Sequence, residues 1–339
     1  MRVFIYEFVT GGGMWHSGKE PADSPLLAEG KAMASAVMAD FALLADVRVV
    51  STRDSRLPAF HPTGCLVSEV TEAEGELATV ALEASLADWT LLIAPETGGA
   101  LLQRCRLVET VRGHLLSPSS AVVAIASDKQ ATAEFLATRR FPVPRGVAIS
   151  AAQAAIPGDF PFPAVLKPVD GCGSQGVRLI PSAQDIPRLL SAERLRLEEY
   201  VPGLAASVAV LCGPKERYPL PACEQRLADD GRFTYLGGRL RLSPKLDGRA
   251  RRLALATVTA LPQALGYIGV DLVLGEAADG SGDRVIEINP RLTTAYVGLR
   301  AASETNLAAA MLAVAAGKPA DLRFRGDAVE FTASGVVSQ

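Results

Sequence analysis

Two oxygen-bearing side chains stand two residues apart at the end of a predicted strand in the C-terminal third of the chain. They are Glu287 and Asn289, in the run 284–289, which reads Arg-Val-Ile-Glu-Ile-Asn. Successive side chains of a β-strand point to opposite faces, so both groups share one face. We expect Ile286 and Ile288 to point the other way, into a core.

A third oxygen ligand, Asp271, lies between apolar residues in the preceding predicted strand, 270–275. If the two strands pair, Asp271 comes alongside Glu287. Carboxylate and amide oxygens suit a hard divalent cation, and Mg²⁺ takes its other ligands from phosphate and water. One such strand alone would more often be a solvated sheet face. Two of them, followed by Asn-Pro-Arg, favour a magnesium site formed by Asp271, Glu287 and Asn289.

A glycine-rich segment, 170–176, follows the predicted strand 164–168, which carries Lys167. Backbone N–H groups of such a turn can approach phosphate oxygens closely, Ser174 adds a hydroxyl donor, and the Lys167 ammonium can neutralise phosphate charge. Taken alone, a glycine-rich hairpin is more often only a hairpin. The segment lacks the Gly-Lys-Ser/Thr ending of a Walker P-loop, so that fold is not indicated.

Two further segments carry weaker signals. The segment 197–203 reads Leu-Glu-Glu-Tyr-Val-Pro-Gly, and a strand ending in this way can offer backbone groups to a purine edge. A near-match to a Walker motif at 13–20 ends in Glu20, where a magnesium-binding hydroxyl is required, and we treat it as a coincidence. The glycines at 11–13, with Trp15 and His16, either contact substrate or form a surface loop.

Strands and helices must position these groups, and over the first 115 residues they alternate. The predicted strands are 2–9, 47–51 and 90–94, and the predicted helices are 25–44, 75–87 and 100–112. This alternation favours a parallel α/β layer, in which loops at the carboxyl ends of the strands build the site. The glycine loops at 11–13 and 98–99 occupy such positions.

The pattern changes after about residue 116 to strands and hairpins with fewer helices. We expect a helix over 127–138 with Ser127 as its N-cap, antiparallel strands over 220–242 and a helix over 249–265. Further strands are expected at 164–168, 177–180, 196–201, 207–212, 270–275 and 284–289. The stretch from about 317 is weakly patterned.

Composition argues against several classes of protein. The 339 residues include 34 Lys and Arg against 37 Asp and Glu, so no positive field favours nucleic acid as a partner. No run of ~20 apolar residues indicates a membrane partner, and the N-terminus predicts a first strand, not a signal peptide. Five scattered cysteines indicate neither a metal cluster nor a full disulfide set, so a cytoplasmic location fits best. A homo-oligomer is compatible with the sequence.

The order of the motifs resembles the ATP-grasp superfamily over most of the chain. The matching segments are Ser-Asp-Lys (127–129), Val-Leu-Lys-Pro (165–168), the glycine-rich loop (170–177), Glu-Glu-Tyr-Val-Pro-Gly (198–203), Gly-Val-Asp-Leu (269–272) and Glu-Ile-Asn-Pro-Arg (287–291). Each is weak alone, but six in the expected order are strong. The resemblance implies an α/β pre-ATP-grasp domain at 1–115, followed by an α+β ATP-grasp fold of two lobes. The small lobe with the lid would span 116–195, the large lobe with the magnesium site 196–325, and a tail 326–339.

The resemblance also implies a role for each matched residue. Lys129 and Lys167 would contact phosphate, and Arg291 would meet the γ-phosphate or an acyl phosphate, so that Arg291 and Lys167 are the catalytic candidates. The lid residues would be Gly171, Gly173, Ser174, Gln175 and Gly176, and the adenine hinge would be Glu198, Glu199, Tyr200 and Val201, partly through backbone groups. The implied cofactors are ATP and one or two Mg²⁺ ions, or Mn²⁺. Family members often have a ribose-binding glutamate where this chain has Ala205, which leaves the ribose contacts open.

A narrower resemblance is to the tyramine–L-glutamate ligases of methanofuran and methylofuran biosynthesis. It rests on the segments 7–13, 94–99 and 289–300. It implies ATP-driven joining of the γ-carboxylate of L-glutamate to tyramine through an acyl phosphate, with small-molecule carboxylate and amine as partners. Arg226 and Arg291 are candidates to bind the glutamate, and Trp15 and Tyr296 are candidates to line the tyramine pocket. Exposed arginines and core aromatics are the commoner interpretation of such residues.

Three other functions share parts of this pattern. Another ATP-grasp ligase, acting on amino acids or peptides, would carry the same motifs and differ in substrate. A nucleotide-binding regulatory protein without turnover is disfavoured because all three candidate metal ligands are present in the sequence. A structural or assembly protein would tolerate the loss of Glu287 and Asn289 together.

Overall fold

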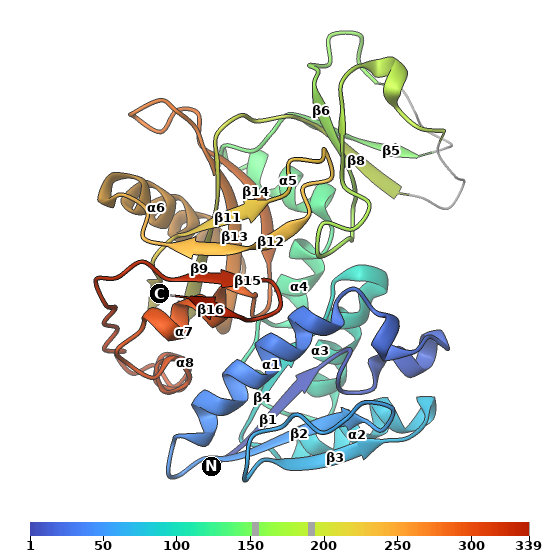
Figure 1. The fold of residues 1–339 in the computed structure, drawn as a ribbon, viewed down its shortest axis with the longest axis vertical. Helices are drawn as coiled ribbons and strands as arrows, with labels where there is room; N and C mark the ends of the chain where they lie inside the picture. Colours follow the sequence, from blue (N-terminus) through green and yellow to red (C-terminus); the bar gives the residue numbers. More distant parts are fainter. Residues whose placement is uncertain (151–155, 189–193, 339) are drawn as a thin grey trace.

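In the computed structural model, three parts of the chain follow one another in sequence (Figure 1). The structure describes residues 1–150, 156–188 and 194–338. The blue N-terminal part holds a parallel sheet, the green part a small antiparallel sheet, and the yellow-to-red part a large antiparallel sheet. This arrangement is the α/β domain followed by two α+β lobes that the sequence predicts.

The N-terminal sheet is parallel, with the strand order β3-β2-β1-β4. Its elements are β1 (Arg2–Glu7), η1 (Gly13–Ser17), η2 (Pro21–Asp23), α1 (Leu27–Ala42), β2 (Arg48–Asp54), β3 (Leu66–Val70), α2 (Ala73–Leu86), β4 (Trp89–Ile93), η3 (Thr97–Gly99) and α3 (Ala100–Thr110). Helices cover both faces, as a buried parallel sheet requires. Val3 and Ile5 pack in a core with α1, whereas Phe4 and Tyr6 pack in another with α2 and α3.

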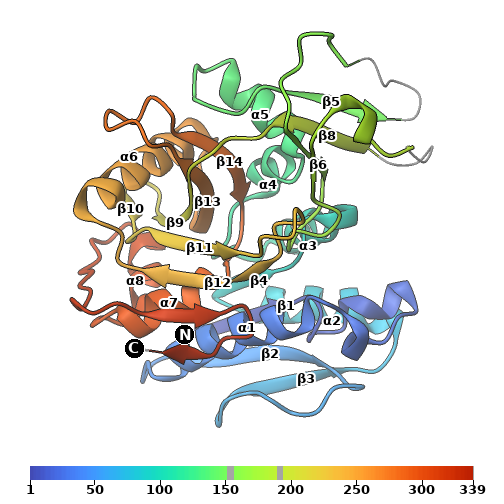
Figure 2. The ribbon, with the colours of Figure 1, turned by 45° about the horizontal axis from the view of Figure 1, so that its top comes forward.

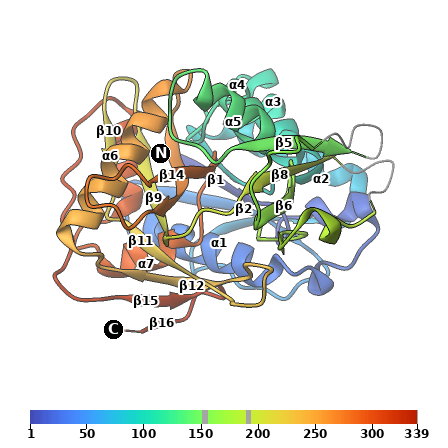
Figure 3. The same cartoon turned by 90° about the horizontal axis from the view of Figure 1, so that it is seen from above.

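Two short helices connect this domain to the small lobe. They are α4 (Ser120–Ala126), which packs on α3, and α5 (Lys129–Ala137), which packs on α4 (Figure 3). The N-cap of α5 is Asp128, whose Oδ1 accepts hydrogen bonds from the backbone N–H groups of Gln130 and Ala131, both at 2.9 Å. The prediction of Ser127 as the cap was wrong, because Ser127 still has helical backbone angles at the end of α4.

The small lobe is an antiparallel sheet with the strand order β5-β8-β6-β7. Its elements are β5 (Gly146–Ser150), β6 (Ala164–Pro168), β7 (Arg178–Ile180), η4 (Ala183–Asp185) and β8 (Arg194–Glu199). Because β8 pairs with both β5 and β6, this sheet continues past residue 195, where we expected the lobe to end. The glycine-rich segment connects β6 to β7.

The large lobe has the strand order β14-β13-β9-β11-β12-β15-β16, and β10 pairs with β9. Its elements are β9 (Leu204–Cys212), β10 (Arg217–Pro219), β11 (Cys223–Leu227), β12 (Tyr235–Leu240), α6 (Pro244–Ala260), β13 (Gly266–Leu274), β14 (Arg284–Asn289), α7 (Ala295–Ala302), α8 (Leu307–Ala315), β15 (Glu330–Thr332) and β16 (Val337–Ser338). One face packs on α6, and the other shares a core with α7, α8 and α1 of the N-terminal domain. The two domains are therefore packed through a common core.

The last residues take part in the large sheet instead of forming a separate tail. β15 pairs with β12 through Gly237, Gly238 and Arg239, and β16 pairs with β15 (Figure 2). Phe331 is buried between this edge and Gly298 of α7, where an added Cβ would lie 2.3 Å from the ring. Across residues 1–150, 156–188 and 194–338, no helix combines the length and apolar character needed to cross a membrane.

Candidate active site

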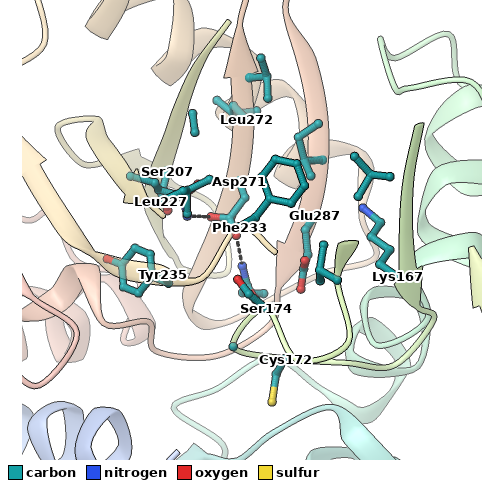
Figure 4. Close-up of a pocket in the computed structure, with 18 of the residues that line it drawn as sticks. Lys167, Cys172, Ser174, Ser207, Leu227, Phe233, Tyr235, Asp271, Leu272 and Glu287 are labelled. Carbon is teal, nitrogen blue, oxygen red and sulfur yellow. Dashed lines mark hydrogen bonds between the residues drawn. The ribbon is translucent and has the colours of Figure 1, made fainter. Parts of the chain in front are cut away.

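A cleft of about 530 Å³ lies between the two lobes, and the predicted site residues line it. Its floor comes from β9, β11, β13 and β14 of the large sheet, and its wall from β6, β8 and the glycine-rich loop (Figure 4). The sequence predictions that line it are Lys129, Lys167, Gly171, Gly173, Ser174, Gln175, Glu198, Glu199, Tyr200, Val201, Asp271, Glu287, Asn289 and Arg291. Gly176 lies in the same loop with a left-handed φ of 73°, but does not itself line the cleft.

Asp271 and Glu287 are direct cross-strand neighbours on β13 and β14. The Asn289 Nδ2 donates to Asp271 Oδ2 at 3.0 Å, and the Gln225 Nε2 of β11 donates to Asp271 Oδ1 at 3.1 Å. Burial, and then the charge of Glu287, raise the Asp271 pKa to about 6. The three predicted metal ligands are therefore together, with two like charges held side by side.

A β-bulge lies between these ligands. Asp271 pairs with Glu287 but Leu272 pairs with Val285, so Ile286 is an extra residue on β14. As a result Ile286 lines the cleft beside Glu287, while Ile288 is buried. The expectation that both isoleucines enter the core was wrong for Ile286, because strict alternation does not hold across a bulge.

The donor set fits Mg²⁺ or Mn²⁺. It contains only carboxylate and amide oxygens, and a divalent cation would offset the repulsion that raises the Asp271 pKa. The described parts of the chain hold no group of three or more His, Cys, Asp or Glu that could bind a metal ion. The set at this site combines two carboxylates with the amide of Asn289. The Lys129 Nζ, 3.2 Å from Glu287 Oε1, supplies part of the compensating charge.

Both predicted phosphate lysines are buried and held by carboxylates. Lys129 also donates through Nζ to the Gly171 carbonyl in the glycine-rich loop. Burial lowers its pKa, but Glu287 and then Glu96 outweigh burial, so the Lys129 pKa is raised overall. The Lys167 Nζ lies 2.5 Å from Glu198 Oε1. Both lysine side chains are thus positioned at the cleft, each beside a carboxylate.

The Glu198 side chain is occupied by this pairing. Its Oε2 lies 2.8 Å from Nε of Arg196, whose Nη1 and Nη2 donate to Gln130 and to the Pro144 carbonyl. The carboxylate therefore orients Lys167, and contacts from Glu198 to an adenine would come from its backbone.

The hinge offers a backbone donor between apolar walls. The Glu199 and Tyr200 N–H groups donate to the carbonyls of Arg145 and Pro163, at 2.8 and 3.1 Å. The Val201 N–H has no acceptor within the described residues. Apolar side chains of the small lobe (Val165, Val177) and of the floor (Leu272, Ile286) line the cleft here. Phe233, on the β11–β12 connection, stacks on Tyr200 with ring centroids 6.3 Å apart.

The glycine-rich loop contacts the N-terminal domain. The Gly98 N–H donates to Asp170 Oδ2 at 3.0 Å, and the Thr97 Oγ1 lies 3.7 Å from the Cys172 Sγ. Ser174 has a left-handed φ of 58°, between Gly173 and Gly176, which are also left-handed. The turn after β4, which the sequence places at the carboxyl end of a parallel strand, therefore contacts the glycine-rich loop.

Arg291 is held by a residue that the sequence reasoning did not assign to the site. Its Nε lies 2.9 Å from Glu96 Oε1 and its Nη2 lies 3.2 Å from Glu96 Oε2. Glu96 follows β4 in the segment 94–99, so its place at a strand end was the available signal. Glu29 of α1 also lines the cleft, and nothing in the spacing of α1 distinguishes it from a surface glutamate.

Several expected substrate contacts lie elsewhere. Tyr296 is fully buried and donates to Asp40, Trp15 stacks on Arg56, and Arg226 pairs with Glu330 on the surface. These predictions were wrong, because residue type alone does not tell a core or surface aromatic from one in a cleft. Phe233 and Tyr235 are the aromatic residues that line the cleft together with Tyr200. The glycines 11–13 pack on Tyr6, Phe8, Thr52 and Val70.

Comparison with known proteins agrees with this geometry. The ATP-grasp domain family matches residues 126–295, and the pre ATP-grasp 3 domain family matches residues 47–144. The chain belongs to the ATP-grasp superfamily. Within it the chain is a carbon–nitrogen ligase, and it is 28% identical over 246 residues to the tyramine–L-glutamate ligase of Methanocaldococcus fervens. That similarity covers 72% of this chain and 71% of the relative.

Solved structures show the same fold. An ATP-grasp superfamily protein from Archaeoglobus fulgidus superposes with a TM-score of 0.71 at 22% identity, covering 98% of this chain and 92% of that chain. The ADP complex of N5-carboxyaminoimidazole ribonucleotide synthetase superposes with a TM-score of 0.72 at 17% identity, covering 98% of this chain and 81% of that chain.

Proposed function

We propose that the protein uses ATP and Mg²⁺ to join the γ-carboxylate of L-glutamate to tyramine, releasing ADP and phosphate. The ATP-grasp fold supports the nucleotide, and the ligase relative supports the two substrates. The observation that carries the proposal is the cross-strand pair Asp271 and Glu287, which faces Lys129, Lys167 and Arg291 in one cleft.

The adenine would lie between the apolar walls at the hinge, with its acceptor nitrogen toward the Val201 N–H. The triphosphate then extends toward Asp271 and Glu287. Metal bound by Asp271, Glu287 and Asn289 would neutralise charge on the β- and γ-phosphates. Lys129 and Lys167 place two ammonium groups along the same path.

In the first step the glutamate carboxylate attacks the γ-phosphorus and the bond to the β–γ bridging oxygen breaks. This gives an acyl phosphate and ADP. When the amine later attacks the acyl carbon, the leaving group is then phosphate instead of oxide. Charge spreads over the phosphoryl oxygens in transit, so positioning and neutralisation supply most of the catalysis. The Arg291 guanidinium, fixed by Glu96, would hold the carboxylate or the transferring phosphoryl group.

In the second step the amine attacks the acyl carbon and phosphate leaves. Water must be kept out, since it would hydrolyse the acyl phosphate. Residues 171–175 of the glycine-rich loop line the cleft, and the loop contacts the turn at 97–98, which supports a lid role. Burial raises the pKa of the Cys172 thiol, so this lid cysteine would not act as a nucleophile.

The test is incubation with ATP, Mg²⁺, L-glutamate and a panel of amines, read by mass spectrometry and by ADP release. We expect an adduct with tyramine in preference to other amines and to amino acids. An adduct with an amino acid instead would favour another ATP-grasp ligase. Nucleotide binding without ADP release for any amine would refute turnover.

A further inference from the structure

A small cavity of about 40 Å³ adjoins the main cleft at the end remote from the hinge. It is formed by the ends of β1 and β4, helix α1 and the lid. Glu29, Cys172, Gly173 and Arg291 line both spaces, so the cavity opens directly onto the catalytic arginine. A volume of this size exceeds what one water molecule needs, roughly 10–15 Å³, and suits a small polar head group.

The charges of the cleft acids and bases show which group is free to bind substrate. Glu287 faces Lys129, Glu198 faces Lys167 and Arg196, and Glu96 faces Arg291. Asp271 is committed to the metal site, and Glu199 and Asp229 lie toward the hinge. Glu29 has no Lys, Arg or His partner within the described residues, and its carboxylate accepts one hydrogen bond, from Thr294 Oγ1 at 3.1 Å.

The surroundings of Glu29 are defined by rigid elements. It lies in the first turn of α1, and α1 is anchored to α7 by Asp40, which accepts from Tyr296 and Arg300 at 2.7 Å each. Thr294 lies three residues after Arg291, so its hydrogen bond fixes Glu29 relative to the catalytic arginine.

Four charged or titratable side chains line the space around Glu29: Arg291, Glu7, Cys172 and Tyr235. Arg291 is already neutralised by Glu96. Glu7 is buried, with its carboxylate against Gly30 and bonded to Val9 and Thr10. Burial raises the pKa of Glu29, Glu7, Cys172 and Tyr235, and none of these side chains can carry a positive charge. Arg291 is therefore the one cationic side chain among the described residues that line the cavity, and it is already paired with Glu96.

We propose that Glu29 binds the ammonium group of the amine substrate and accepts its proton before the amine attacks. The proposal deepens the ligase function and rests on it. One ammonium proton passes to the Glu29 carboxylate, and the nitrogen forms its bond to the acyl carbon. The bond from that carbon to the phosphate oxygen breaks, and the second proton leaves on the phosphate. A carboxylate near the reacting amine also selects against anionic nucleophiles.

The experiment uses Glu29→Gln, which keeps the size and the Thr294 contact but cannot take a proton. Two nucleophiles are compared with ATP, Mg²⁺ and L-glutamate: tyramine, which is an ammonium ion at neutral pH, and hydroxylamine, which is neutral. We expect kcat/KM for tyramine to fall roughly 100-fold, in the range for loss of a general base, and hydroxamate formation to stay within about twofold of the unsubstituted enzyme. Glu29→Asp should recover part of the tyramine activity.

The matched control is Glu74→Gln, an exposed glutamate in the first turn of α2, which should change neither reaction. An equal loss with both nucleophiles in Glu29→Gln would overturn the proposal, because Glu29 would then act in forming the acyl phosphate, the step that both reactions share. Unchanged tyramine activity would overturn it as well. If the unsubstituted enzyme forms no hydroxamate, the acyl-phosphate function itself fails. Hydroxamate without an amide from tyramine or any other amine would refute the ammonium role alone.

Discussion

Arg291 and Glu96 form a buried, two-point ion pair between the end of β14 and the turn after β4. Nε and Nη2 of Arg291 face Oε1 and Oε2 of Glu96 at 2.9 and 3.2 Å, and the Glu96 side chain is 3% exposed. The guanidinium is planar, so two bonds fix its orientation as well as its position. A residue of the N-terminal domain thus sets the geometry of an arginine in the ATP-grasp lobe.

We predict that Glu96→Gln lowers kcat by roughly 10- to 100-fold, because the guanidinium is no longer held in one orientation. The ATP dissociation constant should change by less than about threefold, since the hinge is untouched. Breaking a buried pair also destabilises the fold, by up to roughly 3–5 kcal/mol. Rate measurements, calorimetry and thermal unfolding test these three effects.

The control is Glu330→Gln, which removes the exposed partner of Arg226. An exposed pair contributes about 0–1 kcal/mol, so stability and rate should both stay close to those of the parent. If Glu96→Gln unfolds at the same temperature as the parent and turns over at the same rate, Glu96 does not position Arg291.

Asp271→Asn should separate stability from activity. The Asp271 pKa is raised to about 6 by burial and by Glu287, against roughly 4 for an unfolded aspartate. The folded protein then binds more protons than the unfolded chain between about pH 4 and 6, so metal-free stability from this group falls as pH rises through that window. At pH 7.5 the amide removes this cost, and metal-free Asp271→Asn should unfold at the same or a higher temperature.

The same variant should lose ligation by at least roughly 100-fold, as loss of metal-ion stabilisation implies. Magnesium and ATP together should raise the unfolding temperature of the parent far more than that of the variant. Asp321→Asn, at an exposed pair with Arg323, is the control and should respond to the ligands as the parent does. A variant that is less stable without metal but still active would contradict the assignment.

The sequence was informative about this site where the signal was local. Alternation along β14 placed Glu287 and Asn289 on one face, and the sequence analysis expected Asp271 beside Glu287 on the condition that the two strands pair, which they do. The bulge at Ile286 was not predictable, because it depends on how β14 registers with β13. Likewise the three-residue strand β15 has little pattern of its own and forms only because β12 presents a free edge.

Contacts between segments far apart in the sequence could not be predicted, for a different reason. Glu96 and Arg291 are 195 residues apart, and Tyr296 reaches Asp40 across 256 residues. Periodicity tells which side of an element is apolar, but not which other element covers it. For this reason Tyr296 could not be separated from a cleft aromatic, and Glu29 could not be separated from a solvated helix residue.

Ribose recognition gives a third prediction. Ala205, which lines the cleft, has no side chain for the ribose hydroxyls, but Asp229 on the β11–β12 connection lines the same cleft. We expect the unsubstituted enzyme to bind 2′-deoxy-ATP about tenfold more weakly than ATP, as for loss of one hydrogen bond to a charged group in a partly solvated site. Asp229→Asn should bring the two affinities within about threefold of each other, measured by calorimetry.

The neighbouring carboxylate offers a close control for the ribose prediction. Asp230 accepts from the Arg232 N–H at 2.8 Å within its own turn, so Asp230→Asn should keep the preference for ATP. Equal loss of preference in both variants would indicate that the turn has changed shape. A preference unchanged in Asp229→Asn would place the ribose against another residue.

The contact between Asp170 and Gly98 predicts how tightly the lid excludes water. Asp170→Ala removes the acceptor of the Gly98 N–H, which joins the lid to the turn after β4 at 3.0 Å. A single exposed hydrogen bond contributes about 0.5–1.5 kcal/mol, so folding should be little affected, but the closed lid should be less populated. Water would then reach the acyl phosphate, and phosphate release should exceed amide formation, whereas the parent should release one phosphate per amide. The ratio is measured by phosphate assay and mass spectrometry on the same samples.

Asp185→Ala, at a small-lobe carboxylate that bonds only Ser182 among the described residues, should leave the ratio at one. A ratio of one in Asp170→Ala would mean that the lid excludes water without this contact.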